Sequence, residues 1–74
     1  MITFSYANPS EPNTEVVVTF TNTENSATTT RNVMPVWFDP DPLVEGDEYF
    51  HEEATNSKFE ALSITYDVLQ DLQG

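Results

Sequence analysis

A run of β-branched and aromatic residues at positions 15–23, Glu-Val-Val-Val-Thr-Phe-Thr-Asn-Thr, constrains the fold more than any other stretch of the chain. Side chains of these kinds favour strands because they pack well on a pleated surface. Successive side chains of a strand point to opposite faces, so Val16, Val18 and Phe20 share one face. The run predicts a strand with a fully apolar side, which needs partner strands and a cover.

Two other stretches supply the partner strands. Ile2, Phe4 and Tyr6 alternate with hydroxyl-bearing residues, which predicts a first strand with one apolar face. Residues 28–38, TTTRNVMPVWF, predict a third strand that is apolar on both faces near its end. An antiparallel sheet covered on one side has polar residues on its solvent face, so we expect something to cover the second face here. Pro35 cannot donate a ladder hydrogen bond, which indicates an edge or a bulge.

Polar residues and prolines mark the connections between these strands. Residues 8–13 end the first strand, and residues 22–26, NTENS, have the composition and length of a hairpin loop. The three strands are therefore predicted to form an antiparallel meander. Residues 39–42, Asp-Pro-Asp-Pro, end the third strand because each proline fixes its own φ and restricts the residue before it.

The C-terminal stretch predicts a helix. Ser57 and Glu60 have the spacing of a capping box, so we expect the helix to begin at about residue 58, with Gly74 as its terminator. Strict alternation at residues 61–69 leaves a fourth strand as the alternative. The fold class is thus α+β, a small three-stranded antiparallel meander with one C-terminal helix, in a single small acidic domain at residues 1–74. The helix would carry an apolar stripe that includes Phe59, Leu62, Tyr66 and Leu69.

The charge of the chain restricts its partners. Two basic residues stand against thirteen acidic ones, a formal net charge of −11. Nucleic acids and anionic membranes present dense negative charge and bind through Lys and Arg, so direct binding to either is not expected. Basic surfaces of other proteins are the natural partners. The chain has no cysteine and no long apolar run, so we expect a cytoplasmic protein, in the host cytoplasm if the protein is viral.

Residues 39–53, DPDPLVEGDEYFHEE, hold seven of the thirteen acids and neither Lys nor Arg. Aromatic side chains lie inside or beside this acidic run, and aromatic anchors within a charged rim are typical of binding hot spots. An equal alternative is that these aromatics simply form the core of an undersized protein. The candidate partner-binding residues are the acids Asp39, Asp41, Glu45, Asp47, Glu48, Glu52 and Glu53 and the aromatics Trp37, Phe38, Tyr49 and Phe50.

Catalysis and metal binding have little support in the sequence. His51 is the single histidine, and only Arg31 and Lys58 could stabilise developing negative charge. The sequence also has no glycine-rich phosphate loop and no nucleophile elbow. The acids do not follow the spacing of a calcium-binding EF-hand loop. We therefore expect no enzymatic activity, no cofactor and no designed metal site.

Three functions remain as hypotheses, in this order. The first is an acidic binding or inhibitor protein that mimics DNA and occupies the basic surface of a nucleic-acid-handling protein, with Asp67 and Asp71 adding to its row of carboxylates. In size and charge the chain resembles small acidic phage-encoded proteins that block host or defence enzymes, some of which mimic DNA. The second is a structural or assembly subunit that forms a homodimer through its sheet. The third is a weak calcium-binding module.

Overall fold

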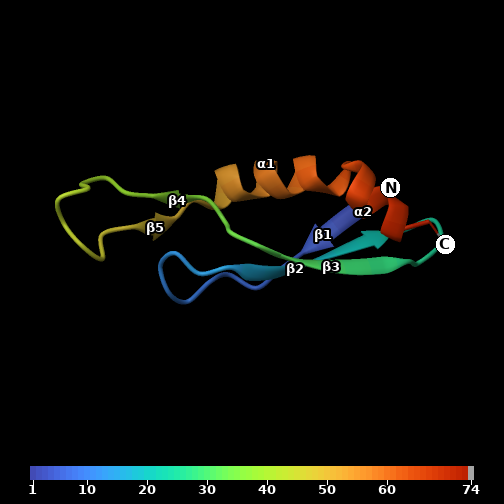
Figure 1. Cartoon of the computed structure of the whole chain (residues 1–74), viewed down its shortest axis with the longest axis horizontal. Coiled ribbons are helices and arrows are strands. Elements are labelled where there is room, and N and C mark those ends of the chain that lie inside the picture. The colour runs from blue at the N-terminus through green and yellow to red at the C-terminus, as the bar shows by residue number, and fades with distance from the viewer. Residues whose placement is uncertain (74) are drawn as a thin grey trace.

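The computed structural model describes residues 1–73 and confirms the α+β class. A three-stranded antiparallel sheet has the order β1-β2-β3, a smaller two-stranded sheet joins β4 to β5, and two helices follow. Both helices lie on the same side of the larger sheet (Figure 1). The elements are β1 (Ile2–Ser5), β2 (Val16–Asn22), β3 (Thr28–Val33), β4 (Trp37–Phe38), β5 (Tyr49–Phe50), α1 (Glu52–Ser63) and α2 (Tyr66–Asp71).

The larger sheet has one apolar and one hydroxyl-rich face. Val16, Val18 and Phe20 of β2 are buried beneath the helices, as the alternation predicts. The opposite face has no cover among the described residues, and Val17 is 57% exposed there. Because the strands pair in antiparallel register, hydroxyl side chains stand next to one another across this face. They belong to Thr3, Ser5, Thr19, Thr21, Thr28 and Thr30.

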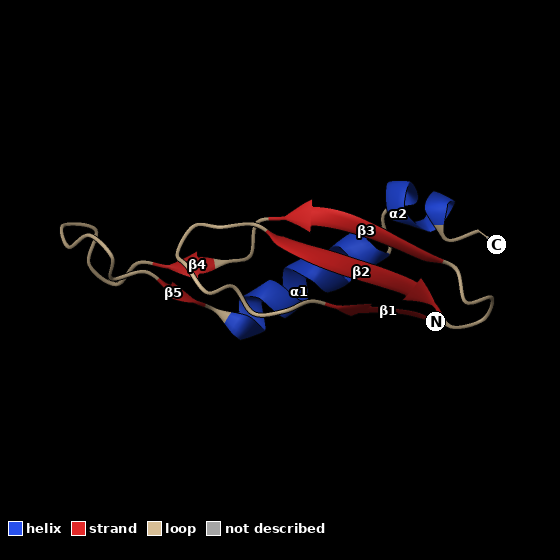
Figure 2. Ribbon diagram, turned by 90° about the horizontal axis from the view of Figure 1, so that it is seen from below, coloured by secondary structure: helices blue, strands red, loops and turns tan. Residues whose placement is uncertain are grey.

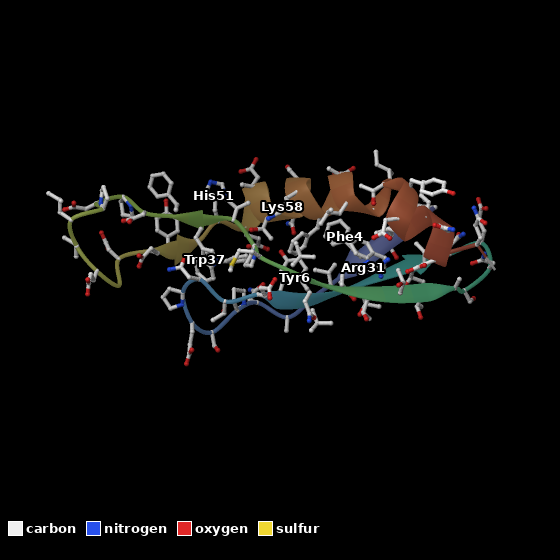
Figure 3. All side chains as sticks on the ribbon, in the orientation of Figure 1. Phe4, Tyr6, Arg31, Trp37, His51 and Lys58 are labelled. Carbon is white, nitrogen blue, oxygen red and sulfur yellow. The ribbon has the colours of Figure 1, made fainter. Side chains whose placement is uncertain are left out.

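Aromatic rings join the helix layer to the sheet. Phe59 of α1 is fully buried and makes edge-on contacts with Phe4 and Tyr6, with ring centroids 6.1 and 5.0 Å apart. Phe4 also contacts Phe20 of β2 at 6.4 Å. Figure 3 shows Phe4 and Tyr6 pointing into the space between the sheet and the helices. Edge-on aromatic pairs stabilise a core beyond their burial, which matters in a domain of this size.

The first helix begins earlier than the capping box predicts. His51 is the N-cap of α1, and its Nδ1 accepts a hydrogen bond of 3.1 Å from the backbone N–H of Ala54. The prediction of a start at about residue 58 is therefore wrong. Glu52 and Glu53 occupy the first turn, where carboxylates interact favourably with the positive end of the helix dipole.

The C-terminal stretch is helical in two parts. The chain leaves α1 at Ile64, and the Thr65 hydroxyl donates to the carbonyl of Leu62 at 2.7 Å before α2 begins. The alternative of a fourth strand at residues 61–69 is thus wrong. The side-chain amides of Asn22, the last residue of β2, and of Asn25 in the hairpin loop both donate to the Leu72 carbonyl and hold the end of α2 against the sheet. Gly74, the expected helix terminator, lies outside the described residues.

The predicted third strand at residues 28–38 is interrupted. β3 ends at Val33, residues 34–36 leave the sheet, and Trp37 begins the separate strand β4. Pro35 stands within this interruption and is buried. The expected cover for a second apolar face is therefore not needed, since the apolar residues beyond Val33 are not part of the larger sheet.

Candidate functional site: an acidic hairpin arm

Residues 37–50 form a hairpin, here called the arm, that projects from one end of the protein. β4 and β5 pair antiparallel, with Trp37 opposite Phe50 and Phe38 opposite Tyr49. The intervening residues 39–48 form a loop at the far end of the arm (Figures 1 and 2). The arm contributes to an elongated molecule with principal extents of 48 × 18 × 16 Å. The body comprises the larger sheet and the two helices, and the arm extends away from it.

The sequence of the loop sets the turn at its tip. The Asp41 carbonyl accepts from the N–H of Val44 at 3.0 Å, and its carboxylate accepts from the N–H of Leu43 at 3.0 Å. Pro42 stands at the second turn position, which its fixed φ suits. Gly46 has a φ of +78°, a left-handed conformation that glycine adopts without strain. Asp41 therefore shapes the turn as well as carrying charge.

The base of the arm is fixed to α1. The backbone N–H of Val36 donates to the Thr55 hydroxyl at 2.8 Å, and the Val36 carbonyl accepts from the N–H of His51 at 2.9 Å. Thr55 is fully buried. Phe50 makes edge-on contacts with Tyr6 of the body at 6.3 Å and with Trp37 at 6.0 Å. The arm is thus anchored at its root by two hydrogen bonds of the Val36 backbone, one to Thr55 and one from His51, and by a chain of aromatic contacts.

The seven predicted acids separate into two groups. Glu52 and Glu53 lie on the first turn of α1, outside the arm. The other five lie on the loop of the arm, where Glu48 is half-buried and the rest are exposed. No Lys or Arg lies within residues 37–50, so the negative charge of the arm has no local counterion. The five acids of the arm are Asp39, Asp41, Glu45, Asp47 and Glu48.

The four predicted aromatics also separate. Phe38 is 46% and Tyr49 is 51% exposed, and their ring centroids lie 5.2 Å apart, so they form an exposed pair on the arm. Trp37 and Phe50 are half-buried at its base. The Trp37 Nε1 is buried without a hydrogen-bond partner among the described residues. Two of the aromatics are therefore available to a partner, and two attach the arm to the body.

Sequence reasoning missed two residues of the site. Leu43 is 94% exposed and Val44 49%, both at the tip of the arm. The signal was present, because two apolar residues follow Pro42 directly inside the acidic run. Exposed apolar side chains at the end of a projecting hairpin are available to enter a partner's pocket.

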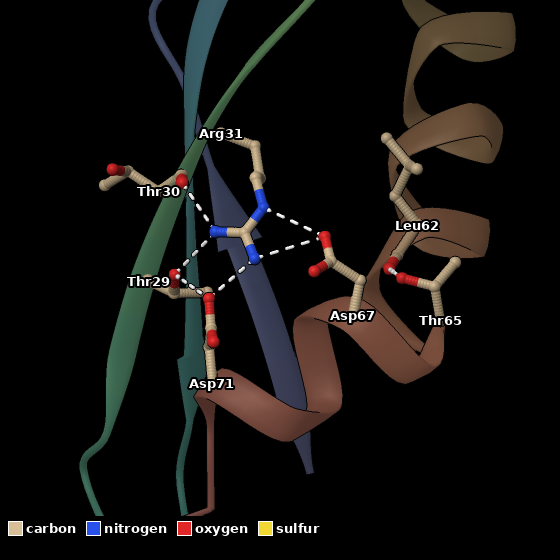
Figure 4. A network of polar contacts seen from close by, with 7 residues as sticks. All are labelled: Thr29, Thr30, Arg31, Leu62, Thr65, Asp67 and Asp71. Carbon is tan, nitrogen blue, oxygen red and sulfur yellow. Dashed lines mark hydrogen bonds and ion pairs between the residues drawn. The ribbon is translucent and has the colours of Figure 1, made fainter.

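Asp67 and Asp71, which were expected to extend the row of carboxylates, pair with Arg31 instead (Figure 4). The Asp71 carboxylate lies 2.6 Å from Arg31 Nη2 and also accepts from the Thr29 hydroxyl at 3.1 Å. These hydrogen bonds lower the pKa of Asp71 below its ordinary value and raise that of Arg31. The other basic side chain, Lys58, donates to the Met34 carbonyl at 2.7 Å. Both basic residues thus make contacts within the body, away from the acids of the arm.

The acids and the single histidine of the described residues are not gathered into a metal site. Within residues 1–73 no group of three or more His, Asp or Glu side chains is arranged to hold a metal ion. His51 serves as a helix cap, with its Nδ1 occupied. Neither helix of the described chain combines the length and apolar character that crossing a membrane requires.

The fold and the arm define a small α+β protein that presents an acidic hairpin with exposed apolar side chains. Comparisons with protein-family models, curated proteins and solved structures give no match to this chain.

Proposed function

We propose that this protein is a non-catalytic binding protein whose arm enters a basic groove on a nucleic-acid-handling protein. The observation that supports the proposal is the combination of five carboxylates with exposed Phe38, Tyr49, Leu43 and Val44 on one projecting hairpin. The carboxylates take the place of phosphates beside the partner's Lys and Arg. Nucleic acid is then excluded from the groove, so the protein inhibits its partner by competition.

Charge and apolar contact have different roles in this proposal. A net charge of −11 steers a basic partner toward the protein and speeds association, most of all at low salt. Rim charges add little to the lifetime of a complex, whereas apolar and aromatic anchors in desolvated pockets add much. The acids of the arm therefore govern the association rate, and Leu43, Val44 and the exposed aromatic pair govern the dissociation rate.

The proposal is tested by capture of partners from a cell lysate at low salt. One variant carries Glu45→Gln, Asp47→Asn and Glu48→Gln on the arm, and leaves the turn-forming Asp41 intact. The matched control neutralises three acids on the connecting loops, Glu11→Gln, Glu15→Gln and Glu24→Gln. Each variant has a net charge of −11 + 3 = −8.

We expect the arm variant to lose one defined nucleic-acid-binding partner that the control retains. DNA or RNA should then compete with the wild-type protein for that purified partner. If both variants lose the partner equally, total charge and not the position of the acids controls capture. An affinity for the partner that hardly changes between low and high salt would contradict phosphate mimicry.

A second candidate function is that of an assembly subunit that associates with its own copy through the sheet. The observation in its favour is the uncovered outer face of the larger sheet, where Val17 is 57% exposed. Sedimentation at micromolar concentration tests it, with Val17→Lys as the variant that should dissociate a dimer. A strict monomer would contradict this function.

A further inference from the structure

The two edges of the larger sheet differ in what lies beside them. At the β3 edge, α2 lies alongside the strand (Figure 2), and the Thr30 carbonyl accepts a hydrogen bond of 2.9 Å from Arg31 Nη1. The same guanidinium bridges to Asp67 and Asp71 of α2. The guanidinium thus occupies one of the outward carbonyls of the β3 edge. Among residues 1–73, no side chain makes a comparable contact with the outward backbone groups of β1.

The backbone groups on the β1 edge follow from the register. The N–H of Thr23 donates to the Met1 carbonyl at 2.9 Å, and pairs with and without hydrogen bonds alternate along an antiparallel ladder. Ile2 and Phe4 therefore direct their N–H and C=O groups away from β2. Tyr6 follows the last residue of β1, and the same alternation continued by one residue would direct its groups outward as well. Among the described residues no hydrogen bond reaches these groups. They form an open row of alternating donors and acceptors.

A groove of about 550 Å³ runs beside this edge, between β1 and α1. Its strand side includes Phe4 and Tyr6, and its helix side carries Glu52, Glu53 and Glu60. Burial and the nearby charge of Glu52 raise the pKa of Tyr6, whose hydroxyl donates to Asn56 at 2.7 Å. The lining contains no Lys or Arg. A segment lying in the groove would meet backbone groups on one side and carboxylates on the other.

We infer that the β1 edge accepts an extended, lysine- or arginine-containing segment of another protein as a fourth strand. The backbone of the segment would pair with Ile2, Phe4 and Tyr6, which is the mode of recognition by strand addition. Alternate side chains of the segment, about 6.8 Å apart, would face α1. Glu53 and Glu60 are two turns apart on the helix, about 10.5 Å along its axis, within reach of flexible basic side chains.

Charge distinguishes this occupant from a second copy of the chain. Pairing of two β1 edges would bring the groove glutamates of both copies to one interface, and like charges in a shared interface oppose association. A basic segment neutralises the same carboxylates. The inference does not depend on the arm, because the arm projects from the end of the molecule and the loop residues that carry its acids do not line this groove.

The test titrates ¹⁵N-labelled protein with the acetylated, amidated hexapeptide Lys-Thr-Lys-Thr-Lys-Thr at low salt. We expect shifted and exchange-protected amides at Ile2, Phe4 and Tyr6, with unchanged amides on the loop of the arm. Glu53→Gln with Glu60→Gln should weaken binding about tenfold. The arm variant Glu45→Gln with Asp47→Asn removes the same charge and should bind the peptide as the wild type does.

A second peptide separates strand pairing from charge attraction. N-methylation at alternate residues of the peptide removes the N–H donors that would face β1 and retains every lysine. We therefore expect that this peptide does not protect the amides of the β1 edge from exchange. Equal binding by the methylated peptide, or equal weakening by both double variants, would overturn strand addition. If the same amides are protected in a dimer without peptide, a second copy of the chain occupies the β1 edge, and the proposal of a basic segment would be wrong. Failure of the arm to capture a partner leaves these results unaffected, so the two proposals can fail separately.

Discussion

The body and the arm of this protein use similar residues for opposite purposes. In the body, Phe4, Tyr6, Phe20 and Phe59 contact one another across the sheet and helix layers. In the arm, Phe38 and Tyr49 contact only each other among the aromatic pairs of the described chain, and both remain about half exposed. The same side-chain chemistry stabilises the fold where two layers enclose it and is available for binding where a single hairpin displays it.

Charge follows the same division. On α2 of the body, Asp67 and Asp71 pair with Arg31, and on α1 Glu52 and Glu53 lie at the positive end of the helix dipole. Carboxylates of the arm have no basic residue within the hairpin. An isolated two-residue ladder has little intrinsic stability, so the arm depends on its anchors to the body. The proposed capture of a basic partner by the arm and the stabilising contacts of the body thus involve different residues, so substitutions can separate them.

The largest expected effect is in the body, at Phe59. Phe59→Ala removes the ring that joins α1 to β1 and leaves a cavity, a change that costs about 3–5 kcal/mol in typical cores. This is comparable to the whole stability expected of a domain of this size. Thermal or urea unfolding followed by circular dichroism should show loss of the folded state. Leu43→Ala on the arm is the control and should leave the transition unchanged; a similar loss there would contradict the division.

A smaller effect is expected at the junction, at Thr55. Thr55→Val keeps the shape but leaves the N–H of Val36 without its 2.8 Å hydrogen bond, at a cost of about 1–3 kcal/mol. Amide exchange should accelerate across β4 and β5 more than across β2, because the junction anchors the arm. Thr55→Ser retains the hydroxyl and should restore protection of the arm. Uniform acceleration over the whole chain would show that the arm and the body unfold together.

How much of this could be read from the sequence differs between the two regions. The alternation of Val16, Val18 and Phe20 identified the buried face of β2, because a strand buried on one side must repeat every two residues. The start of α1 could not be read, because histidine is a less usual N-cap and Ser57 offered a more usual one. The interruption at residues 34–36 was signalled by Pro35, but the pairing of β4 with β5 depends on a contact across the whole acidic loop.

The candidate site was predictable in composition and not in arrangement. The acids and aromatics of residues 37–50 were recognised, yet only three-dimensional packing decides that Phe50 contacts Tyr6 while Tyr49 faces solvent. The pairing of Asp67 and Asp71 with Arg31 was not predicted, because Arg31 lies on β3, 36 and 40 residues away in sequence. Long-range ion pairs of this kind have no local sequence signal.

A smaller, pH-dependent effect is expected at Asp71. Its pKa is lowered in the folded protein, mainly by hydrogen bonds from Arg31 and Thr29, so its contribution to stability is present above its ordinary pKa of 3.8. The contribution is lost as the pH falls through the lowered folded value. Asp71→Asn should therefore be less stable than wild type at pH 7, and the difference should shrink as the pH falls below 3.8 and through the lowered pKa of the folded protein. Asp47→Asn on the arm is the matched control, because Asp47 has no ion pair among the described residues. An equal loss of stability at pH 7 in this variant would show that pairing with Arg31 is not what makes Asp71 stabilising.

The smallest expected effect on stability comes from removing most of the arm. Replacing residues 39–48 by Asn-Gly connects Phe38 to Tyr49 through a two-residue turn that suits an antiparallel pair. The anchors at Val36, Thr55 and Phe50 remain, so the free energy of unfolding should change by less than about 1 kcal/mol.

Capture of a basic partner should be abolished in the same shortened protein, because the five carboxylates and the apolar tip are gone. Urea unfolding and the lysate capture assay measure the two outcomes side by side. A shortened protein that stays folded but still captures the partner would place binding in the body, beside the groove of β1 and α1. One that unfolds would show that the loop stabilises the fold, and the comparison between a stabilising body and a binding arm would fail.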